Sequence, residues 1–193
     1  MLGLKLATDP RWVNIVESNI EEVLTDHAWC EQKAATNGIN MIVQFPEYTD
    51  LVEQMVELVR EEMEHFHRVH AFIIARGYEF GTRRKDDYVN DLNLFVRKGH
   101  VKHIVLIDRL LVSAMIEARS CERFRVLSQN IKDPELAAFY HELMISEATH
   151  YTMFIKLAKK YAAGEDVDKR WQEFLDYEAT IIAKYGNKET IHG

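Results

Sequence analysis

The segment ISEATHY, residues 145–151, carries a glutamate and a histidine three positions apart. Both lie on a stripe with alternating spacings of four and three residues, formed by Leu136, Tyr140, Leu143, Glu147, His150, Phe154 and Leu157. That spacing places the stripe on the face of a helix that packs into a bundle core. Because a lone carboxylate is costly to bury unless it is paired or bound to metal, Glu147 and His150 are predicted metal ligands.

A second pair of this type lies in EEMEHFHRV, residues 61–69, where Glu62/His65 and Glu64/His67 overlap. The apolar face is defined by Val52, Val56, Val59, Met63, Phe66 and Ile74. At about 100° per residue, His67 lies near the middle of that face and His65 nearly opposite, while Glu64 lies off its edge. The inward spacing continues through Ala71, Ile74 and Tyr78. We therefore predict that Glu64 and His67 face inward and that Glu62 and His65 are solvated.

Two further stripes each carry a single glutamate. Glu31 belongs to a stripe with Val13, Ile20, Leu24, His27 and Ala34, and Glu117 to one with Ile107, Leu110, Ala114, Cys121 and Phe124. Glu122 is the rival of Glu117. In an antiparallel hairpin Glu117 meets Glu147 at the same height, whereas Glu122 would lie about a turn and a half too low.

Helix signals divide the chain into long elements, and no stretch shows the alternation of a strand. Helices are predicted from Pro10 to about Asn37 with Gly38 as the stop, from Pro46 to about Arg76 before Gly77, from Val101 to Gln129, from Pro134 to about Ala163, and from Asp168 to Tyr185. The polar connection before Val101 has room for a short helix, and the tail from residue 186 reads as frayed. Four long helices with one long crossover and an additional C-terminal helix predict an all-α, ferritin-like four-helix bundle.

The predicted ligands form a recognisable donor set: one glutamate from each of two helices and Glu-x-x-His from each of the other two. This is the pattern of di-iron and di-manganese carboxylate proteins. Carboxylates bridge hard cations and imidazole adds a neutral nitrogen, which leaves positions open for oxygen. Around this set, His27, Asp26 and Asp108 are candidates to orient ligands, with simple packing or solvation as the alternative.

Length and composition narrow the class of protein. The chain has 193 residues and a net charge of −7, which favours a single domain over residues 1–193 and disfavours a generally basic nucleic-acid binder. Cys30 and Cys121 form no CxxC motif, so a rubredoxin-like module is not expected. Nothing indicates a disulfide framework, so the protein is expected in a reducing cytosol. No segment reads as a signal peptide or membrane span, so no membrane partner is expected.

The residues also carry a family resemblance. The blocks DHAWCEQKAA (26–35), EEMEHFHRV (61–69), IEARSCERF (116–124), ISEATHY (145–151) and RWQEFLDYEATII (170–182) resemble the bacterial tRNA hydroxylases that act on 2-methylthio-N6-isopentenyladenosine. The resemblance implies a cytoplasmic, non-haem di-iron monooxygenase that uses two iron ions (Fe2+/Fe3+) and O2 to hydroxylate the isopentenyl group beside the anticodon. It implies iron ligation by Glu31, Glu64, His67, Glu117, Glu147 and His150. The anticodon loop of tRNA and an external electron donor or reductase would be the partners.

The crossover segment, residues 82–103, is locally basic. Its cations Arg83, Arg84, Lys85, Arg97, Lys98 and Lys102 outnumber Asp86, Asp87 and Asp91. A basic segment of this kind can contact the phosphates of tRNA. The alternative is a solvated loop that does not bind RNA. A ferritin-type storage protein and a rubrerythrin-like peroxidase are rival interpretations of the donor set, and a metal-free helical binding module is the third.

Overall fold

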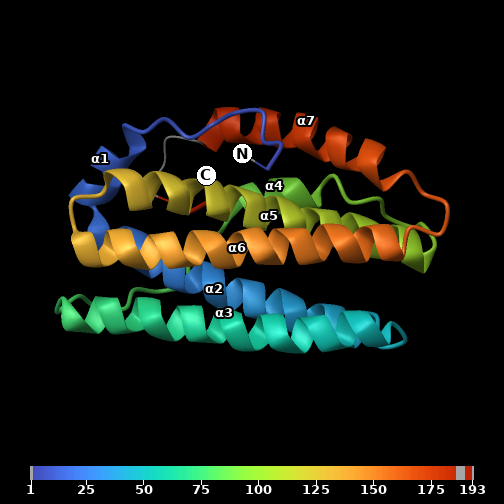
Figure 1. Ribbon diagram of the computed structural model, residues 1–193, viewed down its shortest axis with the longest axis horizontal. Helices are drawn as coiled ribbons and strands as arrows, with labels where there is room; N and C mark the ends of the chain where they lie inside the picture. The colour runs from blue at the N-terminus through green and yellow to red at the C-terminus, as the bar shows by residue number, and fades with distance from the viewer. Residues whose placement is uncertain (1, 186–189, 193) are drawn as a thin grey trace. The chain divides into compact units, whose positions relative to one another are not determined.

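The computed structural model describes residues 2–185 and 190–192, and within these residues the chain forms helices and no strand (Figure 1). Four helices are long, α2 (Ile20–Gln44), α3 (Thr49–Ala75), α5 (Lys102–Asn130) and α6 (Pro134–Lys160). The others are α1 (Trp12–Ser18), α4 (Asp87–Asn93) and α7 (Val167–Tyr185). The predicted order of long helices, crossover helix and C-terminal helix is confirmed.

The described residues divide into two compact units. One unit, the α2–α3 unit, consists of residues 18–85 with 190–191, and the other, the α5–α6 unit, consists of residues 2–17 and 86–185 with His192. Each unit contains one hairpin of long helices, and α4 and α7 pack with α5 in the second. The single domain over residues 1–193 stays a prediction.

The α2–α3 unit corrects one predicted boundary. The first predicted helix is interrupted at Asn19, between α1 and α2. α2 then runs through Gly38 as far as Gln44. Gly38 is not a helix stop because it serves a close approach of the two helices: a Cβ built there would lie 2.8 Å from Cγ2 of Val59. The predicted stop at Gly77 is confirmed, with a φ of +71° that glycine adopts without strain.

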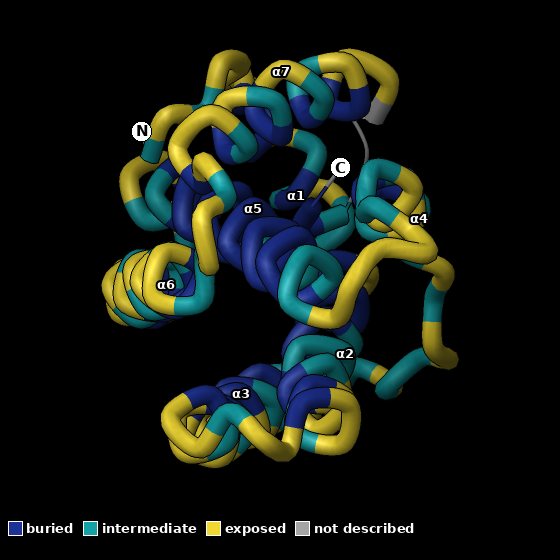
Figure 2. Tube along the Cα trace, turned by 90° about the vertical axis from the view of Figure 1, so that its right-hand side faces the viewer, coloured by how far each residue is buried: buried dark blue, intermediate teal, exposed yellow. Residues whose placement is uncertain are grey.

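In the α5–α6 unit, α5 is buried over nearly its whole length (Figure 2). It packs against α6, α7 and α4. The turn into α6 is held by Asp133, whose carboxylate accepts hydrogen bonds from the backbone N–H groups of Glu135 and Leu136 at 2.9 and 3.1 Å. Pro134 occupies the first turn, as the sequence predicts.

The described end of the chain corrects the prediction of a frayed tail. Ile191 and His192 are buried. The Ile191 N–H donates to Asp26 at 2.9 Å, and the His192 ring contacts Asp86 and Ser120 at 2.8 and 3.2 Å. Glu189 lies outside the described residues. In the part of the chain that the structure describes, no helix combines the length and apolar character needed to cross a membrane.

Candidate metal centre

The α5–α6 unit gathers three potential ligands. Glu117 comes from α5, and Glu147 and His150 come from successive turns of α6. All three are buried, and His150 Nδ1 lies 3.5 Å from an oxygen of Glu147. One donor atom from each lies within 4.8 Å of the others. We call this set the α5–α6 triad; the structure brings together the three residues that the sequence predicts on these helices.

The α2–α3 unit contains a matching set. Glu31 of α2 meets Glu62 and His65 of α3, and at most 7% of each residue is exposed. His65 Nδ1 lies 3.6 Å from Glu62 and 3.8 Å from Glu31. Their donor atoms also lie within 4.8 Å of one another. We call this set the α2–α3 triad. It has the composition of the α5–α6 triad, one glutamate plus Glu-x-x-His.

The prediction that Glu64 and His67 face inward, with Glu62 and His65 solvated, is therefore wrong. The side chains of Glu64 and His67 are 64% and 75% exposed, and they face each other at 3.8 Å on the surface. The buried stripe is instead formed by Leu51, Met55, Leu58, Glu62, His65, Val69 and Ile73. Apolar residues that suggested the other face, including Val56, Met63 and Ile74, are exposed. α3 carries two rows of apolar residues, and the predicted pair Glu64 and His67 belongs to the outer, exposed row.

Glu122, the rival of Glu117, is occupied elsewhere in the α5–α6 unit. Its carboxylate accepts hydrogen bonds from the backbone and hydroxyl of Thr8 and from Arg119, the last at 3.2 Å. Arg119 is fully buried and also donates to Glu178 at 2.6 Å. Glu122 thus anchors the N-terminal segment to α5, which explains how a second carboxylate on this helix is buried without joining the triad.

Two of the three predicted supporting residues lie on α2, the helix that carries Glu31. His27 is fully buried, and its Nε2 lies 2.6 Å from Oε1 of Glu31, a contact that fixes the carboxylate. Asp26 accepts the Ile191 N–H, and Cys30 Sγ lies 3.9 Å from the same oxygen. A role for Asp26 in orienting a ligand stays a prediction.

Comparison with known proteins decides the family. The family model described as tRNA-(MS[2]IO[6]A)-hydroxylase (MiaE) matches residues 2–193. The chain belongs to this tRNA hydroxylase family.

Two relatives in the hydroxylase family are named tRNA 2-(methylsulfanyl)-N(6)-isopentenyladenosine(37) hydroxylase. The Pseudomonas putida KT2440 protein is 38% identical over 160 residues, which is 83% of this chain and 77% of that protein. The Salmonella typhimurium LT2 protein is 37% identical over 142 residues, 74% of this chain and only 51% of that protein. This chain therefore matches about half the length of the second relative.

A solved structure extends the likeness from sequence to fold. Protein 43 with aldehyde deformylating oxygenase activity from Synechococcus matches with a TM-score of 0.90 and 32% identity. The match covers 98% of this chain and 95% of that one. The predicted fold class, all-α and ferritin-like, is thereby confirmed for this member of the hydroxylase family.

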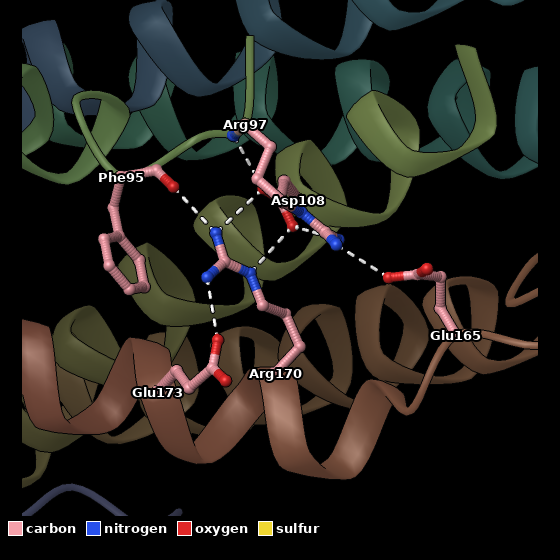
Figure 3. Close-up of polar contacts among 6 residues, drawn as sticks. All are labelled: Phe95, Arg97, Asp108, Glu165, Arg170 and Glu173. Atoms are coloured by element: carbon pink, nitrogen blue, oxygen red, sulfur yellow. Dashed lines mark hydrogen bonds and ion pairs between the residues drawn. The ribbon is translucent and has the colours of Figure 1, made fainter. Parts of the chain in front are cut away.

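Asp108, the third predicted supporting residue, has a different role (Figure 3). Its carboxylate accepts hydrogen bonds from Arg97 and Arg170, with the two guanidinium groups at 2.9 to 3.1 Å. Burial raises the pKa of Asp108, but the hydrogen bonds from the two arginines outweigh it and leave the pKa below its usual value. The prediction that Asp108 orients a ligand histidine is wrong, because it holds the end of the crossover to α5 and α7.

The same cluster removes Arg97 from the predicted tRNA edge. Beyond its bonds to Asp108, Arg97 donates from Nη1 to Glu165 at 2.7 Å, so its charge is already neutralised within the unit. Among the other candidates, Arg84 pairs with Glu22. The exposed ones are Arg83, Lys85, Lys98 and Lys102. Their contact with tRNA stays a prediction.

Proposed function

We propose that this chain hydroxylates the isopentenyl group of 2-methylthio-N6-isopentenyladenosine beside the anticodon of tRNA, with two iron ions and O2. Membership of the hydroxylase family supports the substrate. The observation that carries the iron chemistry is the repeated triad: each unit gathers two buried carboxylates and one imidazole within 4.8 Å.

The donor set fits a pair of iron ions. The proposed ligands are Glu31, Glu62, His65, Glu117, Glu147 and His150. Their four carboxylates together carry four negative charges, which two divalent cations balance, and such charges are rarely buried without that compensation. Carboxylate oxygen with imidazole nitrogen suits iron or manganese, and the absence of thiolates among these six residues disfavours copper(I).

The chain would bind the iron ions, orient their ligands and exclude water from the site, while bound iron would supply the redox chemistry that activates O2. His27 holds the Glu31 carboxylate through its 2.6 Å contact, so this side chain is set before any metal binds. Apolar residues one turn before and after each Glu-x-x-His pair, Leu58 and Val69 on α3 and Leu143 and Phe154 on α6, are buried and exclude water. In the net reaction one oxygen atom enters the C–H bond of a prenyl methyl group. The other leaves as water, with two electrons and two protons from an external donor.

Turnover on RNA tests this function. The full chain is loaded with iron and given ¹⁸O₂, a chemical reductant and tRNA that carries the prenylated base, and the nucleosides are analysed by mass spectrometry. The expected product contains one ¹⁸O atom in the prenyl side chain. Consumption of peroxide with no change in the RNA would instead support the rubrerythrin-like alternative, and iron uptake without either reaction would support a ferritin-like one.

A further inference from the structure

The charge of the α2–α3 unit changes sign between the first part of α3 and the segment formed by its end and the residues that follow it. Residues 49–64 contain six acidic residues and one basic residue, a net charge of −5, whereas residues 66–85 contain five basic residues and Glu79, a net charge of +4. The five are Arg68, Arg76, Arg83, Arg84 and Lys85. Arg84 pairs with Glu22 of α2, and the other four cations still give a local excess of positive charge on a chain with a net charge of −7. The partner of this region is therefore expected to be an anion.

Aromatic rings are interleaved with these cations, and they are only partly buried. Trp29 of α2 stacks on Phe80, with ring centroids 4.9 Å apart and an interplanar angle of 20°. The edges of Phe66 and His70 meet Phe80 at 5.9 and 5.4 Å. All four rings keep intermediate exposure. Partly exposed rings in a basic region are what base stacking needs.

The segment that carries Phe80 is held firmly against α2. Trp29 Nε1 donates to the Gly81 carbonyl oxygen at 2.9 Å, and the Glu79 N–H donates to Glu21 at 3.2 Å. A Cβ at Gly81 would lie 3.1 Å from a methyl group of Thr25, so the backbone there approaches α2 closely. Since the segment is already ordered, a ligand that binds it loses little affinity to ordering.

We propose that this aromatic–basic surface, made by Trp29, Phe66, His70, Phe80, Arg83 and Lys85, binds the single-stranded anticodon loop of the substrate. The loop presents unpaired bases that stack on aromatic faces and phosphates that pair with arginine and lysine. Arg83 and Lys85 are exposed at the end of the segment, where phosphates can reach them. This assignment rests on the proposed function, because it takes tRNA as the substrate and adds where the RNA is held.

The test measures binding of an anticodon stem-loop RNA that carries the prenylated base, by fluorescence anisotropy over a range of salt concentrations. Phe80→Leu removes the central ring and keeps the charge; we expect the affinity to fall about 10-fold with an unchanged salt slope. Arg83→Gln with Lys85→Gln removes two cations and keeps the rings. We expect a salt slope shallower by about 1.4, at about 0.7 per phosphate on a single strand.

Arg60→Gln is the matched control, because it removes an exposed cation from the acidic part of α3, outside the proposed surface. It should leave both the affinity and the salt slope unchanged. Far-ultraviolet circular dichroism and Phe80→Tyr, which keeps an aromatic ring and should restore binding, separate a lost contact from a lost fold.

The outcomes separate this proposal from the proposed function. If the wild-type chain binds and hydroxylates the RNA while both variants bind it equally well, the surface assignment is overturned and the function stands. If the wild-type chain neither binds nor modifies the RNA, the proposed function fails. If the variants lose turnover only when a protein reductase supplies the electrons, with RNA binding intact, the surface belongs to the electron donor and the proposal is overturned.

Discussion

The two overlapping Glu-x-x-His pairs of α3 allow a direct test of the metal assignment. His65→Gln removes a buried imidazole of the α2–α3 triad, whereas His67→Gln removes one whose side chain is 75% exposed. The substitutions are chemically identical and lie half a turn apart on one helix. We therefore expect His65→Gln to lose iron and His67→Gln to keep the iron content of the wild-type chain.

The size of the effect follows from the donor set. Loss of a group that merely supports a ligand weakens metal binding 10- to 100-fold, so loss of a ligand should cost at least about 100-fold, or about 2.7 kcal/mol. With iron in excess, this difference appears as lost stability of the folded state. For a chain of this length it corresponds to a melting temperature lower by about 5 to 10 °C. His67→Gln should change the free energy of unfolding by less than about 0.5 kcal/mol.

Iron per chain is measured by metal analysis after dialysis, and the melting temperature by calorimetry with iron and with a chelator. The deficit of His65→Gln should shrink in the chelator, because the metal-dependent part of the stability is then absent from both proteins. Glu62→Gln and Glu64→Gln repeat the comparison with carboxylates. Iron retained by His65→Gln and lost by His67→Gln would refute the argument that burial on the inner stripe selects the ligands.

Other predictions follow from the packing of each unit. Asp108→Asn should lower the free energy of unfolding by about 2 kcal/mol at pH 7, because it leaves two partly buried arginines without their carboxylate. Since the folded pKa of Asp108 is lowered, its contribution is present above about pH 4 and is lost as the pH falls through the folded value, so urea titrations should converge in acid. Gly38→Val should lower the free energy of unfolding by at least about 2 kcal/mol in the same assay, because a Cβ at this position would lie 2.8 Å from Cγ2 of Val59. Burial, with the nearby Glu147 charge, raises the pKa of Cys121 to about 12, so this thiol should resist maleimide at pH 8 until the chain unfolds, as peptide mass spectrometry would show.

Much of the fold followed from local signals. Gly77 ends α3, and Asp133 with Pro134 starts α6, because each residue has a backbone or capping property that acts within one turn. Gly38 shows the limit of such signals. Nothing near it in the sequence distinguishes a helix stop from a helix crossing, since the reason for glycine is a methyl group of Val59 on the next helix.

Long-range partners set the same limit for charged residues. Asp108 is fully buried and has an arginine 11 positions before it and another 62 positions after it. From the sequence alone, without the positions of the crossover and α7, a buried aspartate on α5 could equally orient a metal ligand. Arg97, counted as a cation for phosphate contact, is for the same reason an internal partner.

The error on α3 had a different cause, because the deciding signal was present in the sequence. On α6 the pair is framed by apolar residues four positions before the glutamate and four after the histidine, Leu143 and Phe154. On α3, the residues at the same positions relative to Glu62 and His65 are Leu58 and Val69, which are also apolar. Around the Glu64/His67 pair, the residue in the first of these positions is Arg60, which is exposed. The number of apolar residues on a face favoured the outer row, although Val56, Met63 and Ile74 in that row are exposed. A bundle buries a charged residue only where the turns above and below it are also buried, so the framing residues identify the inward-facing Glu-x-x-His pair more reliably than the apolarity of the whole face.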